Sequence, residues 1–591
     1  MSRSRVSSLA DLGLIGNCQI AAHVHCDGDI VWSCLPRFDS APVFASLLDP
    51  ERGGRFGIGG PNGERGVQRY LPNTNVLETT ITTADGRFRV IDFAPRFLQY
   101  ERSFRPAKLV RIVEPLEGTP RIRVVCDPRL GWSGERPARE MGSHHVSYRG
   151  FGDELRLTTD APLTYVNGDA FALTGRRHFV LALGAPVEEP LAPLCERFLN
   201  ATTAYWQRWV KHCSVPALYQ DEVIRSALAL KLHCFEDTGA IVAALTTSIP
   251  ESPDSGRTWD YRYCWLRDAY YTLDAFRALG QFEEREAFLQ FLLNIAASSP
   301  NLDLAPLYRI DGRMDLEEAL LTDWQGYPGG QPVRVGNAAA THLQHDVFGE
   351  MVLALAPLFL DARFRGESTP TVLALVRRLT DRAIALAGEP DAGIWEYRDQ
   401  WRPQTFSTVM CWAAADRMAR IAERFAPGEA ATFSAEASRI RALIDAQGVD
   451  PVRGCLVADF GGTEVDAALL QAITLGLYAP DDARVHATLD AIRSDLDLQG
   501  WLRRYRTNDG FGEPSVAFML CGFWMVEALA RSGRDKEARA MLAGLAKARA
   551  PLGLLAEDLD PHTGEMWGNF PQAYSHVGLI NAAFAASPRW G

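Results

Sequence analysis

The helical segments in the later part of the chain alternate between two kinds, and this alternation restricts the fold more than any other feature. Residues 513–533, EPSVAFMLCGFWMVEALARSG, are apolar on nearly every side, whereas the next segment, DKEARAMLAGLAKARA, carries its charges on one face. The same contrast separates RDAYYTLDAFRALG from EEREAFLQFLLNIA. A helix that is apolar all round needs neighbours on every side. About twelve helical segments, inner ones wrapped by outer amphipathic ones, therefore predict a two-layer α-barrel.

The N-terminal part of the chain has a different pattern, made of short runs that favour β-strands. Asp-Gly pairs at Asp27-Gly28 and Asp85-Gly86 separate such runs, which is typical of hairpin turns. RIRVVCD and HFVLALGAP add further strands. We expect an antiparallel β-sandwich over residues 1–193, a helical linker over 194–217 and the helical domain over 218–591.

Composition and charge narrow the class of ligand and the compartment. The chain has 591 residues, 47% of them hydrophobic, and a net charge of -12. Without a long basic run, this balance argues against nucleic acids and anionic membranes as partners and favours a neutral ligand. The eleven cysteines are odd in number and scattered, with no CxxC pair, which favours a reducing cytoplasm over a disulfide framework. The N-terminus is a poor signal peptide, and no apolar run is long enough to span a membrane. The sequence allows a homo-oligomer but does not determine the oligomeric state.

One stretch before a predicted helix combines aromatic and charged side chains. TWDYRYCWLRDAYYTLDAF places Trp259 and other aromatic residues beside Arg267 and Asp268. A sugar ring has apolar C–H faces and a rim of hydroxyl groups, so it needs flat apolar surfaces together with fixed hydrogen-bonding groups. The stretch therefore indicates a sugar site, although an Arg/Asp cluster that caps the helix N-terminus explains the same residues.

Two acids far apart in the sequence are candidates for general acid and base. Glu396 follows Ile394 and Trp395, which favours a partly dehydrated carboxyl of the kind that a general acid needs. Glu557 lies in GLLAEDLDPHTGE, where an acidic surface loop is an equally good interpretation. Taken alone, neither residue is distinguished from an ordinary acid.

Several blocks of sequence, in order along the chain, resemble glycoside hydrolase family 15, the glucoamylase-like enzymes. They are RTWDYRYCWLRDA, PVRVGNAAATHLQHDVFGE, EPDAGIWEYRD, FSTVMCWAAADR and GLLAEDLDPHTGEMWGNFPQAYSHVGLINAA. The N-terminal LADLGLIGNCQIAAHVHCDGDIVWSCLPRFDS is similar to the bacterial and archaeal branch, which includes trehalases. The resemblance implies an antiparallel β-sandwich followed by an all-α (α/α)6 barrel.

The resemblance also implies roles for particular residues. Glu396 matches the general acid of the family and Glu557 the general base. Arg267 and Asp268 match residues that hold the hydroxyls of the terminal glucose. Arg504 is expected to join them, although Arg503 or Arg506 could be the true match, and the expected pocket wall consists of Trp259, Trp395 and Tyr327.

From this resemblance we expect an inverting, exo-acting α-glucosidase that releases β-glucose from short α-glucosides. Glucoamylase-type activity is the first expectation and trehalase the alternative, because Thr258 and Asp558 depart from the family pattern and leave the substrate open. A phosphorylase and a non-catalytic sugar-binding protein are further alternatives. No cofactor is expected and no metal, since His342 and His345 in HLQH are more typical of ordinary helix residues than of ligands.

Overall fold

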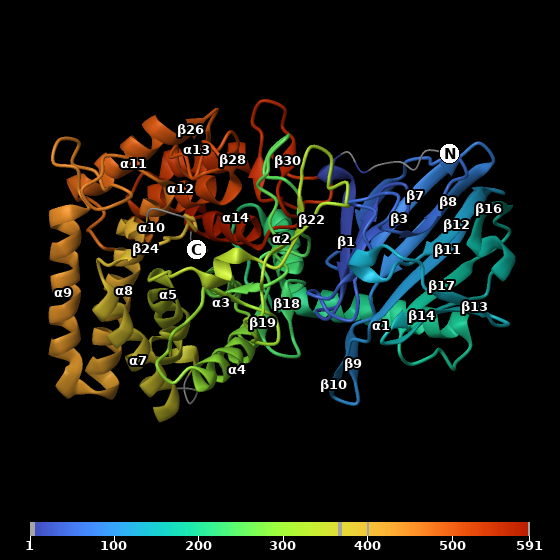
Figure 1. The fold of residues 1–591 in the computed structure, drawn as a ribbon, viewed down its shortest axis with the longest axis horizontal. Helices are drawn as coiled ribbons and strands as arrows, with labels where there is room; N and C mark the ends of the chain where they lie inside the picture. The colour runs from blue at the N-terminus through green and yellow to red at the C-terminus, as the bar shows by residue number, and fades with distance from the viewer. Residues whose placement is uncertain (1–5, 7, 365–368, 399–400, 589–591) are drawn as a thin grey trace.

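The computed structural model describes residues 6, 8–364, 369–398 and 401–588. Two lobes lie side by side, β-sheets formed by the N-terminal part and helices formed by the rest (Figure 1). The predicted order of a β-sandwich followed by an all-α barrel is confirmed. No helix in the described ranges has the length and apolar character that a membrane span requires.

Among the described residues, the N-terminal lobe has two large antiparallel sheets, one of seven strands and one of eight. The first contains β1 (Leu12–Gly16), β2 (Ala21–His25), β3 (Asp29–Cys34), β5 (Arg55–Gly59), β12 (Arg121–Asp127) and β16 (Asn167–Ala172), with β4 (Pro42–Phe44) paired to β3. The second contains β13 (Ala138–Met141), β14 (His145–Phe151), β15 (Asp153–Thr159), β17 (Arg177–Leu183), β11 (Lys108–Gly118), β8 (Gly86–Phe93), β7 (Leu77–Thr83) and β6 (Val67–Tyr70).

The hairpins predicted from Asp-Gly pairs are both present. β2 pairs with β3 across Asp27-Gly28, and β7 pairs with β8 across Asp85-Gly86. Gly28 has a φ of +91°, a conformation that a residue with a side chain adopts only at a cost. The two further predicted strands correspond to β12 and β17.

A long helix leads from the sandwich to the barrel. α1 spans Leu191–Lys211 and contacts β17 and the small hairpin of β9 (Phe97–Gln99) and β10 (Arg102–Phe104). Its buried residues recur every three or four positions, which gives one apolar face to the sandwich and leaves the other to solvent. We retain as a proposal the division into 1–193, 194–217 and 218–591.

In the part of the chain that the structure describes, six inner and six outer helices form the barrel. The inner ring is closed by contacts between successive helices. α3 contacts α5, α5 contacts α8, α8 contacts α10, α10 contacts α12, α12 contacts α14, and α14 contacts α3. The inner helices are α3 (Leu266–Leu279), α5 (Asp346–Leu355), α8 (Thr405–Phe425), α10 (Leu470–Leu475), α12 (Met519–Arg531) and α14 (Ala573–Ala586). The outer helices are α2 (Gln220–Lys231), α4 (Glu283–Ser298), α7 (Pro370–Leu386), α9 (Ala430–Gln447), α11 (Ala483–Leu496) and α13 (Asp535–Leu545).

Burial follows the predicted alternation between the two rings. Every residue of α5 is buried, whereas outer helix α13 buries only Ala538, Leu542 and Leu545. Inner helices also approach closely: a Cβ at Gly349 of α5 would lie 2.2 Å from the carbonyl oxygen of Met410 in α8. The apolar inner helices therefore pack against one another as the sequence pattern predicted.

The sandwich is joined to loops at one end of the barrel by buried polar contacts. Trp32 donates its indole N–H to the carbonyl of Leu245 at 2.8 Å, and His23 Nε2 lies 2.9 Å from the carbonyl oxygen of Phe570. Arg262 is buried and donates to the carbonyl of Ser40 at 2.8 Å. These loops lead into the N-terminal ends of α3 and α14, so the sandwich supports this end of the barrel from outside.

Candidate active site

A cavity lies where the inner helices begin, and it brings together most of the predicted site residues. Its inner part is lined by Ala243, Tyr261, Trp265, Arg267, Asp268, Ile394, Trp395, Glu396, Arg504, Phe518, Trp524, Glu557, Gln572 and Tyr574. Its outer part shares Tyr261, Trp395, Glu396 and Arg504 and extends to Glu251, Arg257, Trp259, Asn337, Ala339, His342, Arg398, Tyr505, Asp509 and Phe511. Glu396 and Glu557, 161 positions apart in the sequence (557 − 396), therefore face one cavity.

Glu396 is held in a tight turn by its backbone and by three donors. Its φ is +60°, a left-handed conformation that is uncommon for a residue with a side chain and clusters at functional sites. Oε1 accepts hydrogen bonds from Trp265 Nε1 at 2.7 Å, an Arg267 guanidinium nitrogen at 3.2 Å and Gln344 Nε2 at 3.3 Å. Since three donors occupy Oε1, a proton carried by this carboxyl must sit on Oε2.

Glu557 is buried more deeply and has fewer partners. It is 2% exposed, Oε1 accepts the hydroxyl of Tyr261 at 2.8 Å, and Oε2 has no hydrogen-bond partner. Burial, and then the neighbouring Glu251, raise the pKa of Glu557 to about 8, against the opposing effects of Arg504 and Tyr261. A carboxylate with a raised pKa is a strong proton acceptor once it is ionised.

A glycine opposite Glu557 leaves room for its side chain. Gly568 has a φ of +77°, and a Cβ at this position would lie 2.6 Å from both Cβ and Oε2 of Glu557. The Gly568 N–H donates to the carbonyl of Pro250 at 2.7 Å, which holds this backbone in place. Any larger residue here would displace Glu557 from the cavity.

Two aromatic side chains connect the acids. Tyr261 donates to Glu557, its ring packs edge-on against Trp265 with centroids 5.4 Å apart, and Trp265 donates to Glu396. This chain of three contacts fixes the relative position of the two carboxyl groups. Both aromatic residues belong to the cluster noted in the sequence, but the sequence does not indicate that they touch the acids.

Arg267 and Asp268 lie in the first turn of α3 at the bottom of the cavity. Arg267 is 7% exposed and donates to the hydroxyl of Tyr574 at 2.6 Å and to Gln344 Oε1 at 3.1 Å, in addition to Glu396. Asp268 Oδ2 is buried without a hydrogen-bond partner, 3.9 Å from Arg267 Nε, and burial raises the pKa of Asp268 to about 7 against the pull of Arg267. A buried acceptor that lines a cavity is suited to receive a ligand hydroxyl.

Among the three candidate arginines, only Arg504 lines the cavity. It is 8% exposed and pairs with both carboxylate oxygens of Glu251. Arg503 and Arg506 instead lie 3.8 Å and 3.1 Å from Glu513 and do not belong to the cavity lining.

The predicted aromatic wall is only partly as expected. Trp395 lines both parts of the cavity and donates its indole N–H to Asp466 at 2.8 Å. Trp259 lines the outer part, but the guanidinium groups of Arg334 and Arg398 lie over its ring at 4.9 and 4.7 Å from the centroid. The Trp259 ring is therefore covered by two guanidinium groups, whereas the sequence indicated a ring face available to a sugar.

The prediction for Tyr327 does not agree with the structure. Tyr327 is 2% exposed, is absent from the lining of both parts of the cavity and packs edge-on against Trp567 at 6.3 Å. The reason is that its loop turns toward the sandwich, where the N–H of Gln325 donates to Asp49 and Trp324 packs against Trp132.

Sequence reasoning missed several residues that hold the site together. Gln344 bridges Arg267 and Glu396, Tyr574 accepts from Arg267, and Glu251 accepts from both Arg504 and Trp259. Gln344 and Tyr574 lie inside the blocks that carry the family resemblance, so they could have been listed as candidates. Glu251 lies in a Gly/Pro-rich loop, where nothing in the sequence separates it from a surface acid.

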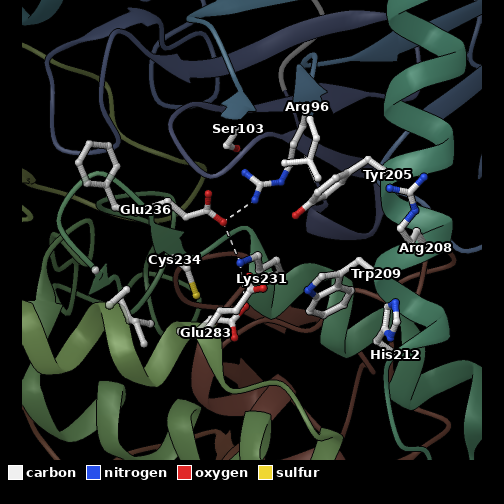
Figure 2. A pocket seen from close by; sticks show the side chains of 16 residues that line it. Arg96, Ser103, Tyr205, Arg208, Trp209, His212, Lys231, Cys234, Glu236 and Glu283 are labelled. Carbon is white, nitrogen blue, oxygen red and sulfur yellow. Dashed lines mark hydrogen bonds and ion pairs between the residues drawn. The ribbon is translucent and has the colours of Figure 1, made fainter. Parts of the chain in front are cut away.

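Figure 2 shows a different cavity, at the junction of the sandwich, α1 and α2. Lys231 Nζ lies 2.7 Å from Glu236 and 2.7 Å from Glu284, and Arg96 of the sandwich also donates to Glu236. Burial alone would raise the pKa of Glu236, but Lys231 and Arg96 hold this pKa at about 2. Lys231 pairs with both acids and Arg96 with Glu236, so these charges join the two lobes.

A ring of inner helices, with two acids and the candidate sugar-binding side chains gathered at one end, matches a glycoside hydrolase of the glucoamylase-like fold. Sequence comparison identifies the family: residues 217–584 match Glycosyl hydrolases family 15, and residues 3–159 match the family described as Trehalase-like, N-terminal. The chain belongs to glycosyl hydrolases family 15. Its reaction is the hydrolysis of O-glycosyl bonds in a sugar substrate.

Individual relatives cover nearly the whole chain. A trehalase of Mycobacterium tuberculosis is 33% identical over 98% of this chain and 90% of its own length. A trehalase of Thermoplasma acidophilum is 33% identical over 94% of this chain and 96% of its own length. A solved bacterial glucoamylase complexed with acarbose has a TM-score of 0.68 at 14% identity, covering 98% of this chain and 94% of that one, which shows a shared fold.

Proposed function

We propose that this chain is a trehalase, an inverting glycosidase that hydrolyses α,α-trehalose to two molecules of glucose. The observation that carries the proposal is its similarity to trehalases over 98% of its length, with both candidate acids facing one cavity. The sequence analysis placed glucoamylase-type activity first and trehalase second. The relatives named trehalase cover more of this chain, at higher identity, than the relative named glucoamylase, which covers 65% at 24% identity.

The two parts of the cavity suit the two rings of a disaccharide. The inner part, with Arg267, Asp268 and Tyr574, would hold the glucose whose bond is cleaved. The outer part, with Arg257 and Arg398 among its polar side chains, would hold the leaving glucose. Fixed polar groups around the second ring favour a defined short substrate over a long polymer.

Glu396 and Glu557 would divide the proton transfers. Glu396 Oε2, the oxygen not occupied by donors, would protonate the glycosidic oxygen, while Glu557 removes a proton from water on the opposite face of the sugar ring. An inverting enzyme separates the two carboxyl groups by about 6.5–9.5 Å so that this water fits. Water attacks C1 and the C1–O bond breaks, so the cleaved ring leaves as β-glucose and the other ring as α-glucose.

A substrate panel tests the specificity. Initial rates of glucose release are measured with trehalose, maltose, isomaltose, kojibiose, nigerose and maltotetraose at equal concentration. Trehalose is expected to have the highest kcat/KM, by about 100-fold or more, because a site built around one set of hydroxyls rejects partners that leave its polar groups unpaired.

Each other outcome of the panel has a definite meaning. Faster cleavage of maltose or isomaltose would overturn the trehalase assignment and restore glucoamylase-type activity. Release of glucose 1-phosphate only when phosphate is added would indicate a phosphorylase. Binding of trehalose without hydrolysis would contradict an enzymatic role for the two acids.

A further inference from the structure

A cluster of metal-ligating side chains lies in the sandwich, away from the cavity. Asp11 ends the turn η1 (Leu9–Asp11), His25 ends β2, and Cys26 begins the β2–β3 turn. One ligand atom from each lies within 4.8 Å of the others. His25 Nε2 lies 3.9 Å from Cys26 Sγ and 3.9 Å from Asp11 Oδ2.

The strand register brings these residues together although Asp11 is distant from the other two in sequence. β1 and β2 pair Leu12 with His25, and the Cys26 N–H donates to the Asp11 carbonyl at 3.0 Å. The sequence predicts a hairpin turn at Asp27-Gly28. The three ligands come together through strand pairing, which the order of residues along the chain does not show.

Neighbouring side chains orient the ligand atoms toward one another. His25 Nδ1 lies 2.8 Å from Asp27 Oδ1, so a proton on Nδ1 is shared with this carboxylate and Nε2 is the ring nitrogen that faces the cluster. A carboxylate behind a ligating histidine is the usual arrangement in metal sites. Arg65 donates to Asp11 Oδ1, which leaves Oδ2 as the oxygen nearest to His25.

The separations and the donor set match a small divalent ion. In a tetrahedral zinc site, with Zn–S about 2.3 Å and Zn–N about 2.0 Å, neighbouring ligand atoms are about 3.3–3.6 Å apart. The two 3.9 Å separations from His25 Nε2 need to contract by only a few tenths of an ångström, and the third pair, Asp11 with Cys26, lies within 4.8 Å. One thiolate, one imidazole and one carboxylate favour zinc over magnesium or calcium, which prefer oxygen ligands alone.

We propose that Asp11, His25 and Cys26 bind one Zn²⁺ ion, with a solvent molecule as the fourth ligand. His25 and Cys26 are 4% and 6% exposed, whereas the Asp11 side chain is 18% exposed and opens the fourth position to solvent. The ion would clamp η1 onto the β2–β3 turn. Since η1 contacts β30 (Met566–Trp567), next to Gly568, the clamp would support the loop opposite Glu557 from the sandwich side. The role of the ion is structural, and this proposal does not rest on the proposed trehalase activity.

The test measures zinc retained by the full-length chain without an affinity tag. After treatment with EDTA, the protein is equilibrated with Zn²⁺ and dialysed, and metal content is measured by mass spectrometry. Wild type is expected to retain one Zn²⁺ per chain, and Cys26→Ser and His25→Gln to bind at least about 100-fold more weakly. Cys213→Ser, which removes a thiol elsewhere, is the matched control and should bind like wild type.

Two readouts decide the proposal even if a variant folds poorly. Co²⁺ bound to the wild type should give a near-ultraviolet thiolate absorption and visible bands typical of tetrahedral cobalt. Asp11→Asn, which keeps the side-chain shape, should weaken binding about tenfold. Loss of all Zn²⁺ from wild type, equal retention by Cys26→Ser, or Co²⁺ without a thiolate band would each overturn the proposal and leave adventitious binding only.

Discussion

The two lobes differ in whether they leave buried carboxylate oxygens without hydrogen-bond partners. In the sandwich, Asp92 is fully buried but accepts two hydrogen bonds from Arg111, itself fully buried. Among the described residues, the buried carboxylate oxygens without a hydrogen-bond partner all lie in the helical part, on Asp268, Glu284, Asp346, Glu350, Asp391, Glu429, Glu557 and Asp558. A native fold tolerates few unpaired buried groups, and those it keeps are often functional. The described sandwich residues therefore pair their buried acids, whereas the helical part keeps several unpaired oxygens, two of which, on Asp268 and Glu557, face the cavity and are available for a ligand.

The largest expected effect comes from removing an acid of the cavity. Glu396→Gln and Glu557→Gln should each lower kcat by about 100-fold or more while the fold survives, because each removes an acid or base function. Initial rates with trehalose and far-ultraviolet circular dichroism are the measurements. Glu565→Gln, on the same acidic loop as Glu557 but exposed, is the control and should keep full activity. Near-normal turnover in either cavity variant would reject the assignment.

In the sandwich, the same kind of change should affect stability and leave turnover alone. Arg111→Met leaves Asp92 buried without its partner, which should lower the free energy of unfolding by about 3–5 kcal/mol. Denaturant titration measures this value, and kcat per folded molecule should stay within about twofold of wild type. Arg87→Met, which breaks an exposed pair with Glu117, should cost about 0.5 kcal/mol or less. A large loss of kcat in Arg111→Met would contradict the claim that the buried pair in the sandwich contributes to stability and not to turnover.

A smaller effect is expected from the residue that holds the candidate base. Tyr261→Phe removes the hydrogen bond to Glu557 Oε1, which at present lowers the pKa of Glu557. The pKa should rise further, so the acidic limb of the kcat/KM profile should move to higher pH and activity at neutral pH should fall about tenfold. Tyr478→Phe, which removes a hydroxyl bonded to Asp445 on an outer helix, should leave the profile unchanged. An unshifted profile in Tyr261→Phe would argue against Glu557 as the base.

The smallest expected effect is on how the stability of the protein depends on pH. The folded pKa of Glu557, about 8, lies above its ordinary value, as do those of Asp268 at about 7 and Asp391 at about 8. The folded barrel then binds more protons than the unfolded chain, so the stability contributed by these carboxyls is full below about pH 4.5 and is lost as pH rises to about 8. Glu557→Gln removes one of them, so its Tm should fall less steeply than that of wild type between pH 5 and 8. Parallel curves would contradict the burial of an unpaired acid at this position.

The sequence pattern predicted the architecture better than the site. Apolar periodicity separates α12 from α13 and α3 from α4, because burial depends on residues a few positions apart. Contacts such as Tyr261 to Glu557 span 296 positions, and no local pattern records them. Tyr327 was misplaced for the same reason, since its loop follows contacts with the sandwich.

The sequence neighbours of Glu396 predict a partly dehydrated carboxyl, in agreement with its 22% exposed side chain. They do not predict that Glu557, 2% exposed, is the more deeply buried acid. Apolar neighbours in sequence do not report which side chains surround a carboxyl in space. Glu251, which contributes to the raised pKa of Glu557, comes from a loop more than 300 positions earlier (557 − 251 = 306).

The most direct test of two acids acting across a water molecule is the fate of that water. Trehalose is hydrolysed in water enriched in ¹⁸O, and the first products are followed by NMR before the anomers interconvert. Equal amounts of α- and β-glucose, with ¹⁸O at C1 of the β anomer alone, are predicted. Label at C1 of α-glucose, or α-glucose as the sole first product, would contradict the account.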